Sequence, residues 1–169
     1  MVRSTSIGPG ASDADKRRYR NMLGQFATGV AVITTIAQDR RPVGVTINSF
    51  SSVSLDPPLI LWSVATAANS SALFDQGQPF AVNVLASDQE TIARQFARSD
   101  GDRFAGVPVL KGTSEAPLIE GCVAHMECAV MARYPGGDHV IIVGVVERYA
   151  SAALTPLLFH SGQYRRLAD

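Results

Sequence analysis

Two segments of the chain gather hydroxyl and amide side chains at the ends of apolar runs. The first contains Thr46, Asn48, Ser49, Ser51, Ser52 and Ser54, and the second contains Ser63, Thr66, Asn69, Ser70 and Ser71. Hydroxyls, amides and free backbone N–H groups are the partners that the carbonyls and ring nitrogens of a buried heterocycle require. The same residue types also occupy turns and helix N-caps without any ligand, so both interpretations stay open.

The second segment also has the form of a phosphate site. Asn69-Ser70-Ser71 is predicted to open a short helix over residues 71–76, and the amides and dipole of a helix N-terminus attract anions. Residues 64–71 contain neither Lys nor Arg. A phosphate bound here would therefore depend on backbone and hydroxyl donors, or on a basic residue from elsewhere in the chain.

Histidines and cysteines offer a further set of reactive groups. Cys122, His125 and Cys128 have a spacing that suggests a metal site, but they fall in a predicted strand, where successive side chains alternate between faces. His125 would then face away from the two cysteines, so we expect structural cysteines, a surface histidine and no metal. His139 follows Gly136-Gly137-Asp138 and starts an apolar run, which places it at a sheet rim beside a tight turn.

Composition excludes several classes of partner. The 169 residues include 15 basic and 15 acidic side chains, so nothing favours nucleic acid or an anionic membrane. No apolar run approaches the ~20 residues that span a bilayer, and the start of the chain does not have the pattern of a signal peptide. With only two cysteines, a cytoplasmic location is expected. We expect a flexible tail over residues 1–14 and one domain over residues 15–169.

The elements that must position these residues are mostly strands. The sequence predicts strands over residues 30–36, 43–50, 59–64, 80–85, 122–133, 139–149 and 157–159, with a possible resumption near Tyr164. Helices are predicted near residues 13–26, from an apolar stripe, and after Ser87, where Ser87-Asp88-Gln89-Glu90 matches a capping box. Residues 98–121 are expected to be irregular. Because βαβ units are missing, the pattern indicates a mainly β protein, a β-barrel with peripheral helices.

Several common catalytic motifs are absent from the sequence. It has no G-x-G-x-x-G after a strand, no G-x-x-x-x-G-K-S/T and no G-x-S-x-G. A nicotinamide cofactor, if one is used, must bind without a Rossmann domain.

An ordered series of short motifs carries a family resemblance. The series is Ala27-Thr28-Gly29-Val30, Ile33-Thr34-Thr35, residues 46–54 (TINSFSSVS), Leu55-Asp56-Pro57-Pro58, residues 80–85 (FAVNVL), Gly137-Asp138-His139, Pro156-Leu157-Leu158 and Gly162-Gln163-Tyr164. Each motif is weak alone, but the ordered set is specific, and the resemblance extends over about residues 19–167. The chain resembles the flavin reductase-like family, the reductase components of two-component flavin monooxygenases.

The resemblance implies a homodimeric split β-barrel that binds FAD or FMN and takes hydride from NADH or NADPH. It implies a partner monooxygenase that receives the reduced flavin. It also implies that residues 46–54 and those after the third strand bind flavin, and that His139, Tyr164 and His160 bind the nicotinamide dinucleotide. The expected cofactor-binding residues are Thr34, Thr46, Ile47, Asn48, Ser49, Ser51, Ser52, Ser63, Asn69, Ser70, Ser71, Asn83, His139, His160 and Tyr164. No side chain is expected to be catalytic, because hydride passes between the two cofactors.

Two alternatives remain at this stage. One is a flavin-binding or haem-binding module on a similar barrel without reductase turnover. The other is a flavin oxidase related to pyridoxamine-phosphate oxidases, which would need basic groups for a substrate phosphate. The Gly-Asp-His turn and the Gly-Gln-Tyr ending favour the reductase, because a flavin carrier needs no nicotinamide site.

Overall fold

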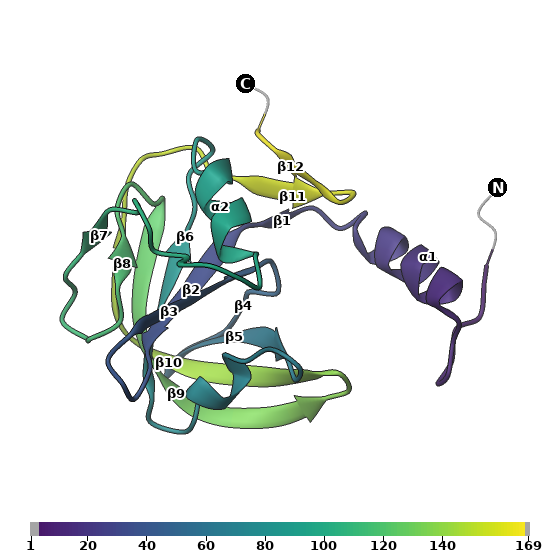
Figure 1. Ribbon diagram of the computed structural model, residues 1–169, viewed down its shortest axis with the longest axis horizontal. Helices are drawn as coiled ribbons and strands as arrows, with labels where there is room; N and C mark the ends of the chain where they lie inside the picture. The colour runs from purple at the N-terminus through teal and green to yellow at the C-terminus, as the bar shows by residue number, and fades with distance from the viewer. Residues whose placement is uncertain (1–3, 168–169) are drawn as a thin grey trace.

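Strands dominate the computed structural model, which describes residues 4–167. Figure 1 shows the elements within that range. They are α1 (Asp13–Leu23), β1 (Thr28–Gly29), β2 (Ala31–Ile36), β3 (Pro42–Ile47), β4 (Ser51–Leu55), β5 (Pro58–Ala65), the 3-10 turn η1 (Ser71–Leu73), β6 (Pro79–Val84), α2 (Glu90–Phe96), β7 (Val109–Leu110), β8 (Leu118–Ile119), β9 (Ala124–Gly136), β10 (His139–Ser151), β11 (Leu158–His160) and β12 (Gln163–Arg165).

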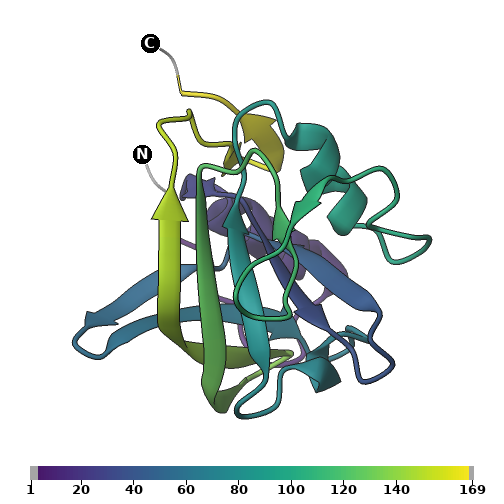
Figure 2. The same ribbon diagram turned by 90° about the vertical axis from the view of Figure 1, so that its left-hand side faces the viewer.

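Seven of the strands form one antiparallel sheet in the order β3-β2-β6-β9-β10-β5-β4. Its two long strands, β9 and β10, run up one side of the molecule and bend across its base (Figure 2). A register shift between Val143 and Gly144 accompanies this bend, as expected for a β-bulge. Gly144 also leaves room for Phe80, because a Cβ at this position would lie 2.5 Å from the Phe80 ring. The mainly β, split-barrel class predicted from the sequence is confirmed.

Two buried clusters hold the fold together. The larger one lies inside the curled sheet around Trp62, Phe74 and Phe80, and the Trp62 and Phe74 rings meet edge to face at 4.7 Å. The smaller one packs α2 and β11 against the outer side of β2, with Phe96 fully buried. Because α2 rests on β2 and β3, it fixes the end of β3, where the first polar segment begins.

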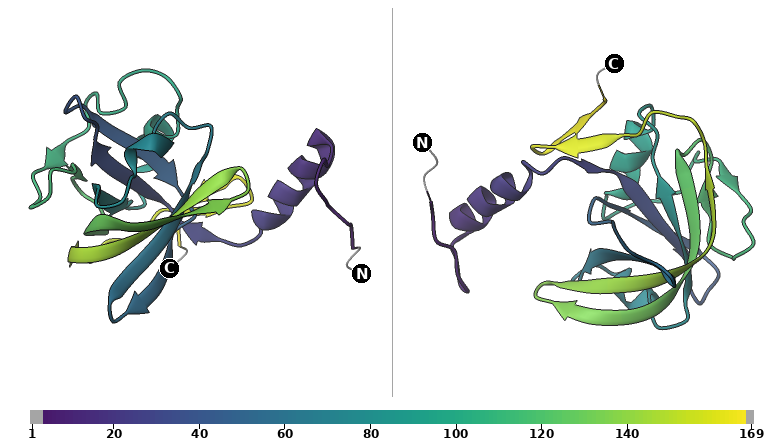
Figure 3. Two further views of the ribbon diagram at one scale, coloured as in Figure 1. Left: turned by 90° about the horizontal axis from the view of Figure 1, so that it is seen from below. Right: turned by 180° about the vertical axis from the view of Figure 1, so that it is seen from behind.

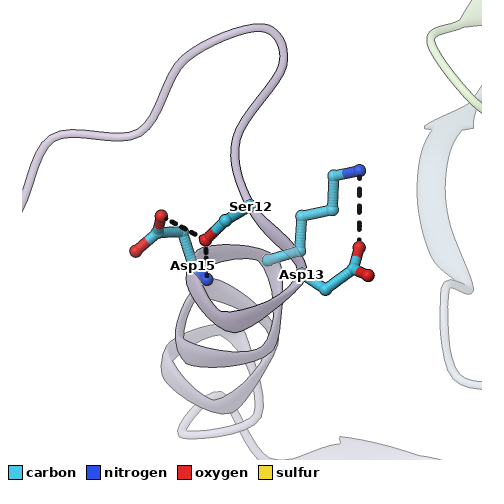
Figure 4. Close-up of polar contacts among 4 residues, drawn as sticks. Ser12, Asp13 and Asp15 are labelled. Carbon is cyan, nitrogen blue, oxygen red and sulfur yellow. Dashed lines mark hydrogen bonds and ion pairs between the residues drawn. The ribbon is translucent and has the colours of Figure 1, made fainter.

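The N-terminal helix α1 differs from the rest of the chain. The Ser12 side chain caps it by accepting a hydrogen bond from the Asp15 backbone N–H (Figure 4), and the chain leaves its C-terminus through Gly24. The helix stands away from the barrel (Figure 3), and none of its eleven residues is buried. The predicted helix is therefore confirmed, but no other segment of residues 4–167 buries its apolar stripe.

Other predictions were less accurate. The strand predicted over residues 43–50 ends at Ile47, and β4, which the sequence analysis did not predict, follows it. The capping box at Ser87 is wrong. Gln89 is the N-cap of α2 and makes no side-chain cap, because its amide instead accepts from the Ala86 N–H and donates to the Glu120 carbonyl. The expected tail boundary at residue 14 falls inside α1, and residues 1–3 lie outside the described residues.

Candidate functional site

The predicted polar segment borders a hollow on the surface of the barrel. This β3–β12 hollow has a volume of about 160 Å³, and its walls are Val30, Thr46, Ile47, Asn48, Phe159 and Tyr164. Four of these side chains are apolar or aromatic, while Thr46 and Asn48 supply a hydroxyl and an amide. The lining suits a flat heterocycle, whose faces need apolar contact and whose edges need hydrogen bonds.

Segments that are far apart in the sequence form the walls. The Thr46 hydroxyl donates to the Ala93 carbonyl of α2 at 2.7 Å, which fixes the end of β3 and leaves the oxygen lone pairs to accept a hydrogen bond. On the other side, β11 pairs with both β1 and β12. The Phe159 and Tyr164 rings, which are cross-strand partners in that sheet, pack at 5.4 Å.

The positively charged Arg94 side chain packs against Tyr164, which lines the β3–β12 hollow. The Arg94 guanidinium is 4.9 Å from the centre of the Tyr164 ring, a cation–π contact, and two of its N–H groups donate to Glu90 Oε1. Burial raises the pKa of Tyr164, and the Arg94 charge partly opposes that shift. Arg94 was not singled out from the sequence, because 70 positions separate it from Tyr164.

A continuous path joins the hollow to His139. Ser49 follows Asn48, and its hydroxyl both accepts from the Ser63 N–H at 2.9 Å and donates to the Ser63 carbonyl. Ala65 lies two residues after Ser63 on β5, about 7 Å away along the strand, and it is the register partner of His139. Ser49 and Ser63, one residue from each polar segment, therefore link the hollow to the start of β10.

The histidine at the end of this path is held by its neighbour. His139 Nδ1 lies 2.7 Å from Asp138 Oδ1, and both side chains are exposed. This hydrogen bond, helped by the charges of His139 and of Lys16, lowers the pKa of Asp138. His139 thus occupies the strand start beside the Gly137-Asp138 turn, as the sequence predicts, and its Nε2 is on the far side of the ring from Asp138.

Comparison with known proteins decides the family. The family model "Flavin reductase like domain" matches residues 23–168. The chain belongs to the flavin reductase-like family. It is 39% identical over 97% of its length to the flavin-dependent monooxygenase reductase subunit HsaB of Rhodococcus jostii, covering 85% of that protein. It is 40% identical over 95% of its length to the FMN reductase (NADH) SmoA of Agrobacterium fabrum, covering 90% of that protein.

A solved structure agrees with these relatives. The NADH:FAD oxidoreductase SgcE6 of Streptomyces globisporus, in complex with NAD and FAD fragments, superposes with a TM-score of 0.87 at 41% identity. The match covers 98% of each chain. The chain is therefore an enzyme, a flavin reductase, as the sequence motifs predicted.

The phosphate site predicted for this flavin reductase at residues 69–71 has little support in the structure. Only three residues form the 3-10 turn, and Ser70 makes no side-chain cap. Ser70 and Ser71 are buried, and the Ser71 N–H already donates to the Ala68 carbonyl. Arg133, which donates to the Ser71 carbonyl, also pairs with Asp75. Asn69 is exposed but lies outside the lining of the β3–β12 hollow.

Two residues expected in the cofactor site of the reductase lie in the interior instead. Thr34 and Asn83 are fully buried. Asn83 donates to Thr34 and to the Val32 carbonyl and accepts from the Ile119 N–H, while Thr34 donates to the Pro117 carbonyl. These bonds fasten the segment that ends in β8 onto the sheet, so we leave both residues out of the proposed site.

The remaining predicted residues do not line the β3–β12 hollow. Ser51 and Ser52 are exposed on β4, and Ser51 Oγ donates to the Ser52 carbonyl. His160 ends β11, next to Ser161, whose N–H donates to the Gly24 carbonyl. Val30 and Phe159 were missed as lining residues. Both belong to or adjoin quoted motifs, but nothing in an apolar residue of a strand reveals that it faces a ligand.

Cys122 and Cys128 are both buried and unpaired, as expected of structural cysteines, and burial raises the pKa of each thiol to about 12. His125 is half-buried rather than on the surface, with Nε2 2.7 Å from the Ile119 carbonyl oxygen. Within residues 4–167, no three His, Cys, Asp or Glu side chains gather closely enough to hold a metal ion. Neither helix in that range has the length and apolar character to cross a membrane.

Proposed function

We propose that this flavin reductase transfers hydride from NADH to FAD or FMN and passes the reduced flavin to a flavin-dependent monooxygenase. The β3–β12 hollow carries the proposal, because two family motifs, residues 46–54 and Gly162-Gln163-Tyr164, meet there. The relatives support it: their names describe a monooxygenase reductase subunit, an NADH-dependent FMN reductase and an NADH:FAD oxidoreductase. They favour a reductase over the flavin carrier or oxidase considered from the sequence.

The residues of the hollow fit an isoalloxazine ring. Val30, Ile47 and Phe159 offer apolar contact to its faces, and the Asn48 amide and the Thr46 oxygen offer partners to its polar edge. Flavin and nicotinamide supply the redox chemistry when both are bound. The task of the protein is to hold the two rings in contact, and such positioning lowers a barrier by up to about 7–11 kcal/mol in well-oriented systems.

The small volume of the β3–β12 hollow also fits a reductase that releases its flavin. About 160 Å³ is less than the roughly 300–1,000 Å³ of a typical ligand pocket, so one chain encloses only part of a flavin. A partly enclosed flavin leaves readily, and a reductase that serves a separate monooxygenase must release its product. The two free thiols fit a reducing, cytoplasmic setting for this exchange.

Asn48→Leu tests the site. We expect the leucine to raise the dissociation constant for flavin about fivefold, because one hydrogen bond worth on the order of 1 kcal/mol is lost. The fold should be unaffected, since Asn48 is exposed. Flavin titration by fluorescence gives the affinity, and NADH oxidation gives the activity. Asn69→Leu is the matched control, and equal affinities in both variants and the wild type would remove Asn48 from the site.

His139→Ala tests the nicotinamide side. We expect a clearly higher KM for NADH and a much smaller change in kcat. A contact that stabilises the bound substrate and the transition state equally affects KM when it is lost, and leaves kcat nearly unchanged. Steady-state kinetics at saturating flavin provide the measurement. A thousandfold lower kcat at an unchanged KM would instead make His139 a catalytic residue.

A homodimer completes the proposal. Large apolar side chains on α1 and in the segment just after it are exposed. The exposed fraction is 44% for Tyr19, 55% for Met22, 51% for Leu23 and 79% for Phe26. An eleven-residue helix with nothing packed on it is marginal in water, so another surface must cover this stripe. The sheet edge β4 exposes apolar groups too, with Leu55 95% accessible. In a two-fold dimer each copy would offer both features to the other.

Light scattering tests the assembly. We expect the wild type to have twice the mass of the 18.0 kDa chain at micromolar concentration, and Phe26→Asp to shift it towards the monomer, because a charge in an apolar interface is costly. Arg17→Ala, on α1, should leave the mass unchanged. A wild-type monomer would contradict the dimer.

A further inference from the structure

A second hollow among the described residues lies outside the predicted site. This α2 hollow has a volume of about 540 Å³ and lies between α2 and the loop that follows it. Three arginines, Arg94, Arg98 and Arg103, line it together with Asp100 and Asp102. Its size is within the range of pockets that hold a nucleotide-sized ligand. Residues 64–71 supply no basic side chain for a phosphate, whereas this hollow contains three.

The three arginine side chains have more N–H groups than their hydrogen bonds to other described residues use. A guanidinium carries five N–H groups. Among the hydrogen bonds of residues 4–167, Arg103 gives one N–H to the Gly44 carbonyl, Arg98 gives one to Asp100, and Arg94 gives two to Glu90. The remaining N–H groups can engage phosphate oxygens, for which the planar fork of arginine is well suited.

The walls of the α2 hollow are held in place. The Gln95 amide donates to the Arg103 and Ala105 carbonyls, each at 2.9 Å, and so fastens the loop to α2. The loop is tied to the barrel as well, through the 2.7 Å bond from Arg103 to the Gly44 carbonyl of β3. The arginines therefore converge on the hollow before any ligand arrives.

The two hollows are neighbours. Arg94 lines the α2 hollow, and it lies on the ring of Tyr164, which lines the β3–β12 hollow. A second link runs along β3. The carbonyl held by Arg103 belongs to Gly44, two residues or about 7 Å from Thr46. A ligand with its ring in the first hollow and a ribosyl diphosphate attached would extend towards the second.

From this geometry we infer that the α2 hollow binds the adenosine diphosphate part of a dinucleotide cofactor, with the arginines on the phosphates. The two carboxylates distinguish this ligand from a simple anion, because ribose hydroxyls donate to carboxylates as phosphates accept from guanidinium groups. The inference rests on the proposed function. FAD and NADH both carry an adenosine diphosphate, so the experiment must separate them.

Arg98→Glu is the decisive variant, because Arg98 lines the α2 hollow and does not touch the other one. Its side chain is 64% exposed, so the fold should tolerate the change. Arg148→Glu, an exposed position on β10, has the same charge change and serves as the control. We expect the dissociation constant for ADP, measured by calorimetry, to rise about tenfold in Arg98→Glu and to stay unchanged in Arg148→Glu.

Comparing FAD with FMN, and NADH with reduced nicotinamide mononucleotide, shows which cofactor places its adenosine diphosphate in the α2 hollow. If the hollow takes the FAD adenylate, Arg98→Glu weakens FAD binding and leaves FMN binding intact. If it takes the NADH adenylate, the variant raises the KM for NADH but not that for reduced nicotinamide mononucleotide. Either result supports the inference. Equal behaviour of both variants with all four cofactors, or no binding of ADP to the wild type, would overturn it. FMN reduction by the mononucleotide would still show that the reductase function stands.

Discussion

Replacing Gly44 with alanine is expected to lower the free energy of unfolding by about 2 kcal/mol and to weaken flavin binding. Gly44 lies on β3, facing α2, and a Cβ there would be 2.4 Å from Cε1 of Phe96. The Phe96 ring is fully buried and packs edge to face on Phe104 at 4.8 Å, so it has no free space to move into. The added methyl group must therefore push α2 away from the sheet.

The functional effect follows from the same displacement. Moving α2 breaks the 2.7 Å bond from Thr46 to the Ala93 carbonyl and shifts Arg94 from the Tyr164 ring, so two walls of the β3–β12 hollow lose their support. Thermal unfolding should show a melting temperature lower by roughly 4–8 °C. Gly29→Ala is the matched control, because a Cβ at this other strand glycine meets no atom within 4 Å. Equal melting temperatures for the two variants would contradict the packing argument.

The sequence predicted best where local chemistry alone determines the structure. The β9–β10 hairpin follows from two long strands, of which β10 is rich in Val and Ile, and from a turn in which Gly137 adopts a positive φ of 72°, a conformation that glycine reaches without strain. His139 was placed correctly because its position depends only on that turn. Pro58 at the first position of β5 is another local signal, since proline suits the start of a strand.

Strand β4 could not be predicted in the same way. Its sequence, Ser-Ser-Val-Ser-Leu, is mostly exposed and contains a register shift between Ser52 and Ser54. It pairs only with β5, at the edge of the sheet, so neither burial nor alternation marks it as a strand. The polar residues that suggested a ligand site are in part the residues of this edge strand.

Contacts between distant segments also escaped the sequence analysis. Arg94 meets Tyr164 because α2 and the β11–β12 hairpin pack on the same side of β2, and local spacing gives no sign of this. The α2 hollow was missed for a different reason, because its arginines lie within ten residues of one another and line one hollow only through the way the loop folds back onto Gln95.

There is a specific reason why the sequence did not reveal that Thr34 and Asn83 are buried. Alternation of polar and apolar residues separates the two faces of a strand only where one face meets water. All of Ala31–Thr35 is buried in β2, and four of the six residues of β6 are buried, so both strands are covered on both faces. Membership in a family motif then shows that Thr34 and Asn83 matter, but not whether they face a cofactor or the interior.

Asn83→Leu separates these two roles. The leucine removes both bonds that the Asn83 amide donates, to Val32 and Thr34, and leaves the Ile119 N–H without its 2.7 Å acceptor. Each buried group left unpaired costs about 1–3 kcal/mol, so we expect the free energy of unfolding to fall by roughly 3 kcal/mol. The structural role also requires the flavin dissociation constant of the folded variant to stay within about twofold of the wild type, a change far smaller than the tenfold that 1.4 kcal/mol would produce. Urea unfolding and flavin titration measure the two quantities, and Asn69→Leu, at an exposed position, should change neither by more than about 0.5 kcal/mol. A variant with wild-type stability and a tenfold weaker affinity for flavin would place Asn83 in the cofactor site after all.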